Sequence, residues 1–252
     1  MAVATPSRPA ATPAPEPAPL PVAPRLVACV RAAAGDLYFN SWRLVPMNLV
    51  WGLLLLAVLG AAGLGSGLAL LALPLLALPQ AGLARMAALI VRGETVALSD
   101  GFGAWPRFLV PALALGAAIL AAAALLSFNL VTGLLDGGIV TVAVATLAAW
   151  GLVVLAAFGV AAWPLLADPA REDQPARERL RIAALLVVAH PVRAIALAVL
   201  VVVFLAVSTL AFAALLTVSV AFATQVAARY VLPAADRLEA RLARGRGAAA
   251  RG

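Results

Sequence analysis

The chain has 252 residues, of which 65% are apolar and only 12% are charged. A soluble domain carries about 25% charged residues, so these charges are too few for a water-soluble surface, and lipid must cover much of the protein. The net charge of +7 comes from 18 basic residues, all of them Arg. Arg flanks the hydrophobic segments, as the positive-inside rule requires, and we therefore expect no nucleic-acid binding.

Residues 1–24 contain eight prolines, which predicts a disordered or polyproline-II tail that is dispensable for insertion. Residues 25–43 predict a helix that lies in the membrane interface, because apolar residues share one face and aromatic residues follow at its end. The apolar face carries Leu26, Val30, Ala34 and Leu37, and the end carries Tyr38, Phe39, Trp42 and Arg43.

Four long stretches contain no Asp, Glu, Lys or Arg, and a spanning helix needs about 20 apolar residues. The sequence therefore predicts an all-α, polytopic transmembrane helical bundle. We expect about six spans, near residues 44–62, 68–91, 108–131, 139–167, 193–208 and 210–230. Pro74 and Pro79 interrupt the second span, which is either kinked or partly re-entrant. Residues 175–189 predict a further helix, outside the spans. The last charge-free stretch holds one long span or two, and we divide it near Ser208.

The distribution of Arg favours six spans with both termini in the cytoplasm. The four cytoplasmic segments then carry 4, 3, 5 and 6 Arg, which accounts for all 18, and the three outer turns carry none. Five spans would place the six C-terminal Arg outside, against the positive-inside rule. Residues 25–232 thus form the membrane domain, and residues 233–252 form a cytoplasmic Arg-rich tail that is suited to anionic lipid.

Deep in the predicted spans the polar residues are neutral. An ion-coupled transporter usually has an ionisable residue at depth, and none is present here. Asn48, Gln80 and Asn129 are candidates for a neutral-polar substrate path. The alternative, which we favour, is that they hold helices together by hydrogen bonds.

The sequence offers no catalytic, metal-binding or cofactor-binding set. His190 is the only histidine, which excludes a metal site built from several histidines and leaves no credible Ser-His-Asp set. Gly63, Gly65 and Gly67 follow a membrane helix rather than a strand, so they do not match the dinucleotide fingerprint. We therefore expect a protein that is not an enzyme and needs no cofactor.

Residues 92–107 are predicted to form a polar cytoplasmic loop and are the candidate partner-binding site. Exposed aromatic residues mixed with Arg are typical of binding hot spots. Alternatively, Trp105 and Arg107 anchor the third span at the lipid headgroups, while Glu94 and Asp100 form local ion pairs. The candidate residues are Arg92, Glu94, Asp100, Phe102, Trp105 and Arg107.

Several short motifs between residues 38 and 232 resemble those of the YesL-like family of bacterial membrane proteins, a domain family of unknown function. They are Met47-Asn48-Leu49-Val50-Trp51 at the start of the first span, Gly82-Leu83-Ala84-Arg85, Val91-Arg92-Gly93-Glu94, Leu98-Ser99-Asp100-Gly101-Phe102, Ala162-Trp163-Pro164-Leu165-Leu166-Ala167-Asp168 and His190-Pro191. The resemblance implies an integral protein of the bacterial cytoplasmic membrane. Because members are often encoded near carbohydrate ABC importers, it also implies an accessory role in sugar uptake.

We therefore expect an accessory or regulatory membrane protein whose partner is an ABC transporter subunit or a second copy of the chain. The alternative is a small transporter or channel with a neutral-polar path. A hydrophilic cavity that reaches mid-membrane between the first three spans would favour the transporter, and dry packing there would favour the accessory protein.

Overall fold

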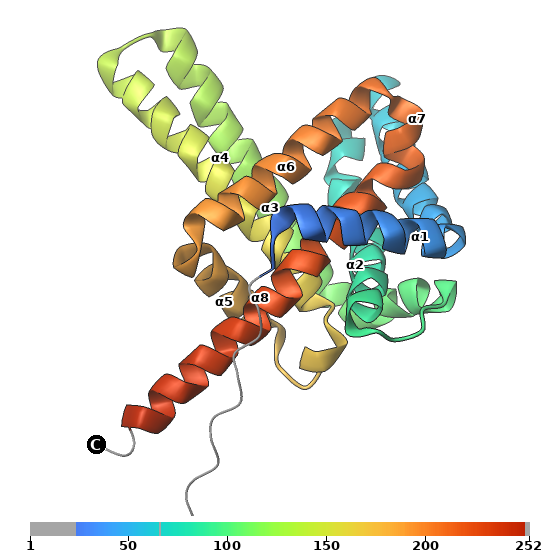
Figure 1. Ribbon diagram of the computed structural model, residues 1–252. Coiled ribbons are helices and arrows are strands. Elements are labelled where there is room, and N and C mark those ends of the chain that lie inside the picture. Colours follow the sequence, from blue (N-terminus) through green and yellow to red (C-terminus); the bar gives the residue numbers. More distant parts are fainter. Residues whose placement is uncertain (1–23, 66, 250–252) are drawn as a thin grey trace, which may run out of the picture.

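Every element in the described part of the chain, residues 24–65 and 67–249 of the computed structural model, is helical (Figure 1). Six helices are long and apolar enough to cross a membrane, so the predicted helical bundle is confirmed. The predicted tail, residues 1–24, lies outside the described residues except for Pro24. The elements are α1 (Leu26–Gly63), η1 (Gly67–Leu76), α2 (Ala77–Arg92), α3 (Leu98–Asp136), α4 (Ile139–Leu166), η2 (Pro169–Arg171), α5 (Ala176–Ala189), α6 (Pro191–Leu210), α7 (Phe212–Ala214), η3 (Leu215–Ser219) and α8 (Val220–Ala249).

The predicted interfacial helix and the first span form one element, α1, with a bend at Asn40. Asn40 has non-helical backbone angles, and its side chain donates a hydrogen bond to the carbonyl oxygen of Asp36. Three aromatic side chains near the bend are largely exposed, as residues of the headgroup layer would be. They are Tyr38, Phe39 and Trp42.

The second span is bent rather than straight. It begins as the 3-10 helix η1, which contains Pro74, and continues as α2 without a gap. Pro74 and Pro79 lack the N–H that an α-helical hydrogen bond needs, which accounts for the tighter first half. Because residues 69–92 qualify together as one spanning segment, the structure supports the kinked alternative.

The last charge-free stretch forms two spans, and the break between them lies at Ala211, slightly later than predicted. The hydroxyl groups of Ser208 and Thr209 bond back to carbonyl oxygens within α6, so these residues continue the helix instead of ending it. Ala211 has φ −103° and ψ 69°, and the chain then returns as α7, the π-helical turn η3 and α8.

The predicted loop at 92–107 is mostly helical, and the prediction was wrong in this respect. Only residues 93–97 connect α2 to α3. Gly93 ends α2 with a φ of 77°, a left-handed conformation that favours glycine. Asp100 Oδ2 accepts a hydrogen bond of 2.7 Å from the Ala97 N–H, which stabilises the start of α3. Residues 98–107 are therefore the first turns of a 39-residue helix.

The helices form a bundle around α8. The apolar part of the segment Phe212–Gly245, which comprises α7, η3 and most of α8, is 72% buried inside the protein, against 11% for α4. This last segment is therefore the central span, and α4 faces lipid. The turns that follow α1, α3 and α6 lie toward the top of Figure 1, whereas the α4–α5 connection and the C-terminal half of α8 lie toward the bottom. The end of the bundle that contains residues 93–97, the α4–α5 connection and the C-terminal half of α8 is called the charged end.

The turns that follow α1, α3 and α6 lie at the same end of the molecule, so the orientation of the protein in the membrane can be tested. We expect a reporter that works only outside the cytoplasm to be active when fused after Gly65, Gly137 or Ala211. None of these turns contains Arg, so the positive-inside rule places them outside. The same reporter fused after Glu94 should be inactive. Activity after Glu94 together with inactivity after Gly137 would reverse the proposed orientation.

Candidate functional site

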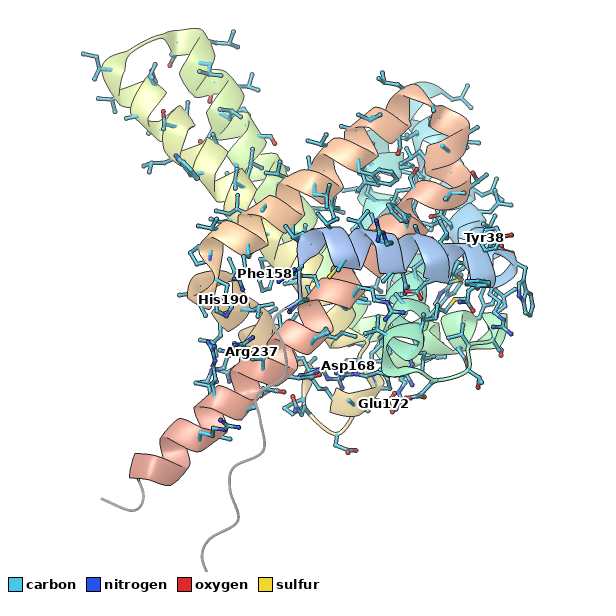
Figure 2. All side chains as sticks on the ribbon, viewed as in Figure 1. Tyr38, Phe158, Asp168, Glu172, His190 and Arg237 are labelled. Carbon is cyan, nitrogen blue, oxygen red and sulfur yellow. The ribbon has the colours of Figure 1, made fainter. Side chains whose placement is uncertain are left out.

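Charged side chains gather where the end of α2, the α4–α5 connection and α8 meet, near the labelled residues Asp168 and Glu172 (Figure 2). Two Arg and three carboxylates form one group, called the ion-pair cluster: Arg92, Asp168, Arg171, Asp236 and Glu239. Asp168 is fully buried, and Arg171 is 3% exposed.

Asp168 is the centre of the ion-pair cluster. Arg92 donates to both carboxylate oxygens, from Nε to Oδ1 at 3.0 Å and from Nη2 to Oδ2 at 2.6 Å. Arg171 Nη1 also donates to Oδ2, and the Ala170 N–H donates to Oδ1 at 3.2 Å. A bidentate Arg–carboxylate pair has strict geometry, so Asp168 fixes the end of α2 against the chain that follows α4.

The same two Arg connect this point to α8. Asp236 accepts from Arg92 Nη1 at 2.7 Å and from Arg171 Nη2 at 2.6 Å, and Glu239 accepts from Arg171 Nη2 at 2.6 Å. Burial alone would lower the pKa of the Arg171 guanidinium, but its hydrogen bonds to Glu239 and Asp236 outweigh burial, and the pKa lies above its ordinary value. The ion-pair cluster therefore ties three segments together: the end of α2, the α4–α5 connection and α8.

A second set of contacts surrounds Glu172. Its carboxylate pairs with Arg85 of α2 and Arg107 of α3. Its backbone oxygen accepts from Arg179 Nη2 at 3.0 Å, and Arg179 also donates to the carbonyl oxygens of Gln174 and Leu166. Burial lowers the pKa of the Arg179 guanidinium, and the negative charge of the nearby Glu172 carboxylate offsets part of this effect.

The six candidate residues of the 92–107 segment fall into two groups, those with internal contacts and those that are exposed. Arg92 belongs to the ion-pair cluster, and Asp100 caps α3. The Trp105 ring packs edge-on against Phe102, with 5.2 Å between the ring centroids. Phe102 is 40% exposed, and the side chain of Arg107 is 50% exposed. Together with exposed Glu94, these two side chains are the ones that a partner can reach.

The three candidates for a polar path have different surroundings and do not form one continuous group. Asn48 is fully buried and bonds only to backbone: Nδ2 donates to the oxygens of Leu215 and Leu216 at 3.1 and 2.7 Å, and Oδ1 accepts from the Ala221 N–H at 2.6 Å. Gln80 donates to the Thr224 hydroxyl at 3.1 Å. Asn129 lies half-buried on α3.

Two adjoining cavities inside the spans are mostly apolar. One of about 590 Å³ lies among α4, α6 and α8, and one of about 240 Å³ lies beside η1 and α3. Trp51, Gln80 and Trp163 line both, whereas Asn48 and Asn129 line neither. A hydrated polar substrate would find few partners there.

Sequence reasoning missed most of the paired charges. It did not predict four residues of the ion-pair cluster as site residues, although one of them, Asp168, ends a family motif. The others are Arg171, Asp236 and Glu239, and the Asp36–Arg229 pair was also missed. Asp36 accepts from Arg229 Nε and Nη2, both at 2.6 Å, and from Gln225 Nε2 at 2.8 Å. For Asp36 a signal was available, because it is the only acidic residue of the mostly apolar helix α1 and a buried carboxylate needs a partner.

No group of three or more His, Cys, Asp or Glu in the described residues is arranged to hold a metal ion. No protein-family model matches the chain, and no match was found among curated proteins or solved structures.

Proposed function

We propose that this multi-span membrane protein is a non-enzymatic accessory or regulatory component of a transport system, and that it acts through its charged end. The observation that carries the proposal is the difference between the polar side chains inside the membrane, which bond to other helices, and those at the charged end, some of which are accessible. Asn48 and Gln80 are occupied by hydrogen bonds between helices, and the two cavities that Gln80 lines are mostly apolar. Accessible charged and aromatic groups remain at the charged end.

The resemblance to the YesL-like family is the basis for the partner. It suggests a membrane subunit of a carbohydrate ABC importer in the bacterial cytoplasmic membrane, with self-association as the second option. Both termini and the charged end then face the cytoplasm, where the subunits that hydrolyse ATP lie. This orientation also agrees with the distribution of Arg.

The alternative function, a small transporter with a neutral-polar path, has less support. Of its three candidate residues, only Gln80 lines the two intramembrane cavities. A continuous path would need Asn48 to be free, yet both polar atoms of its side chain are bonded to backbone at full burial.

The proposed partner surface consists of the exposed side chains of Glu94, Phe102 and Arg107, and it is tested with the double variant Glu94→Arg, Phe102→Ala. Both side chains are exposed, so the fold should be unaffected, and co-purification of the importer subunit or of a differently tagged second copy should fall about tenfold or more. Asp100 is left intact because it caps α3. The thermal unfolding temperature in detergent should match that of the wild type.

The matched control is Asp173→Arg combined with Val188→Ala, which makes the same kinds of change at two exposed positions. It should leave co-purification unchanged. If the Glu94/Phe102 variant keeps its partner and the cellular phenotype while Gln80→Ala abolishes that phenotype, the accessory function is wrong and the transporter is favoured.

A further inference from the structure

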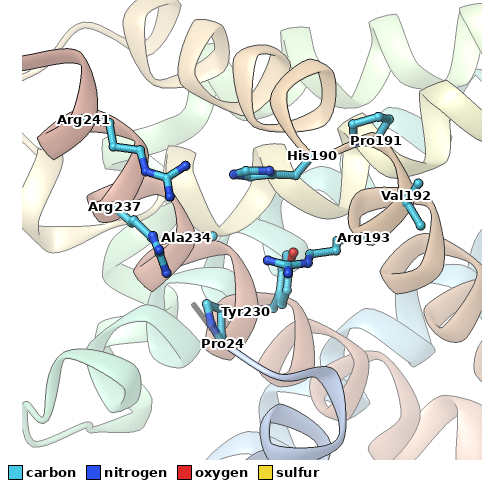
Figure 3. Close-up of a pocket in the computed structure, with 9 residues that line it drawn as sticks. All are labelled: Pro24, His190, Pro191, Val192, Arg193, Tyr230, Ala234, Arg237 and Arg241. Atoms are coloured by element: carbon cyan, nitrogen blue, oxygen red, sulfur yellow. The ribbon is translucent and has the colours of Figure 1, made fainter. Parts of the chain in front are cut away.

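A basic cleft of about 450 Å³ lies between α8 and the junction of α5 with α6 (Figure 3). Arg237 and Arg241 from α8 face His190 and Arg193 from the junction, and Tyr230 lies between them. The cleft is separate from the contacts proposed for the partner surface.

The fold places these groups together by the periodicity of α8. Tyr230, Ala234, Arg237 and Arg241 follow one another at spacings of four, three and four residues, so they share one face of the helix. Asp236 and Glu239 point to a different face, where they join the ion-pair cluster. The central helix thus uses Asp236 and Glu239 for internal pairing and leaves Arg237 and Arg241 for the cleft.

The cleft has a strong positive charge that the described residues do not neutralise. Its lining residues include Arg193, Arg237 and Arg241 and no carboxylate, and none of the three forms an ion pair with a described residue. The Arg237 Nε is buried without a hydrogen-bond partner. Arg193 lies in the first turn of the 20-residue helix α6, whose dipole adds positive potential. A bound anion would satisfy these groups.

We propose that the cleft binds a phosphate group, and that its source is the headgroup of an anionic phospholipid. Guanidinium groups match the geometry of phosphate oxygens and bind them with charge-assisted hydrogen bonds. Val192 lines the cleft and is 79% exposed, and the exposed apolar face of α6 continues through Val199 and Val203. Acyl chains can therefore lie along α6 while the phosphate occupies the cleft.

The test measures the binding of short-chain phosphatidylglycerol to the full-length protein in neutral detergent, by native mass spectrometry. The triple variant Arg193→Gln, Arg237→Gln, Arg241→Gln should bind it at least about tenfold more weakly. The control triple variant, Arg31→Gln, Arg177→Gln, Arg181→Gln, removes the same charge at exposed positions and should change the affinity by about twofold or less. Equal weakening by both triple variants would overturn the proposal.

A single substitution guards against a folding defect. Val192→Glu adds a carboxylate to the cleft at an exposed position, so binding should weaken while the thermal unfolding temperature stays the same. Unchanged binding by this variant, or equal affinity for phosphatidylcholine, would contradict the proposal. If inorganic phosphate binds as tightly as phosphatidylglycerol and displaces it, the phosphate site stands and the lipid source is overturned.

Discussion

Replacement of Asp168 by Asn is expected to lower the free energy of unfolding by about 3–5 kcal/mol, because the buried Arg171 and the partly buried Arg92 then lose one of the two carboxylates that they share. Asp168 is fully buried and accepts from both Arg92 and Arg171. Asn keeps the size of the side chain but removes the charge. The measurement is thermal or denaturant-induced unfolding of the purified protein in detergent.

The control for this variant is Glu178→Gln. Glu178 forms an exposed pair with Arg181 at 3.4 Å, and such pairs contribute about 0–1 kcal/mol. The two substitutions make the same chemical change, and only the burial and the number of partners differ. Equal effects of Asp168→Asn and Glu178→Gln would show that the ion-pair cluster does not stabilise the fold.

Replacement of Asn48 by Leu is expected to lower the free energy of unfolding by about 2–4 kcal/mol, because each buried polar group left unpaired costs about 1–3 kcal/mol. Asn48 bonds to the carbonyl oxygens of Leu215 and Leu216 and to the N–H of Ala221. These groups belong to the π-helical turn η3 and the start of α8, where the α-helical hydrogen-bond pattern is interrupted.

Two further substitutions separate hydrogen bonding from packing. Asn48→Asp keeps an acceptor for Ala221 but turns a carboxylate toward two carbonyl oxygens, so it should be at least as destabilising as Leu. Asn129→Leu, at a half-buried position on α3, should change stability by less than about 0.5 kcal/mol. If Asn48→Leu is as stable as wild type, the side chain is not needed to hold η3, and the case for a role in transport is renewed.

Gly52, one turn after Asn48 in α1, shows how closely α1 approaches η3. A Cβ at Gly52 would lie 2.7 Å from the Leu216 oxygen and 2.8 Å from its Cα, too close for any side chain without backbone movement. Gly52 therefore permits the approach of α1 to η3 that Asn48 requires for its hydrogen bonds. The Asn48 segment, which resembles a family motif, is explained here by the packing of two helices.

The number and the approximate placement of the spans follow from the sequence alone. Stretches without charge must be long enough to cross the hydrocarbon layer, and residues between 43 and 229 offer enough of them for six spans once the last is divided. The sequence also indicated the helix at 175–189 and the kink near Pro74, since proline removes a backbone donor whatever the tertiary context. These features depend on local chemistry and on the thickness of the bilayer.

The contacts of the polar residues, in contrast, depend on the tertiary structure. Arg92 is 76 residues from Asp168 and 144 from Asp236, and no local spacing could pair them. The sequence therefore grouped Arg92 with its neighbours Glu94 and Phe102 as an exposed loop, whereas in the fold it is an internal contact. In the same way, the division of α8 into a face that pairs with Arg171 and a face that lines the basic cleft depends on which helices surround it. The packing of helices that are distant in sequence determines which charged side chains form ion pairs, because only the folded bundle brings the two partners together.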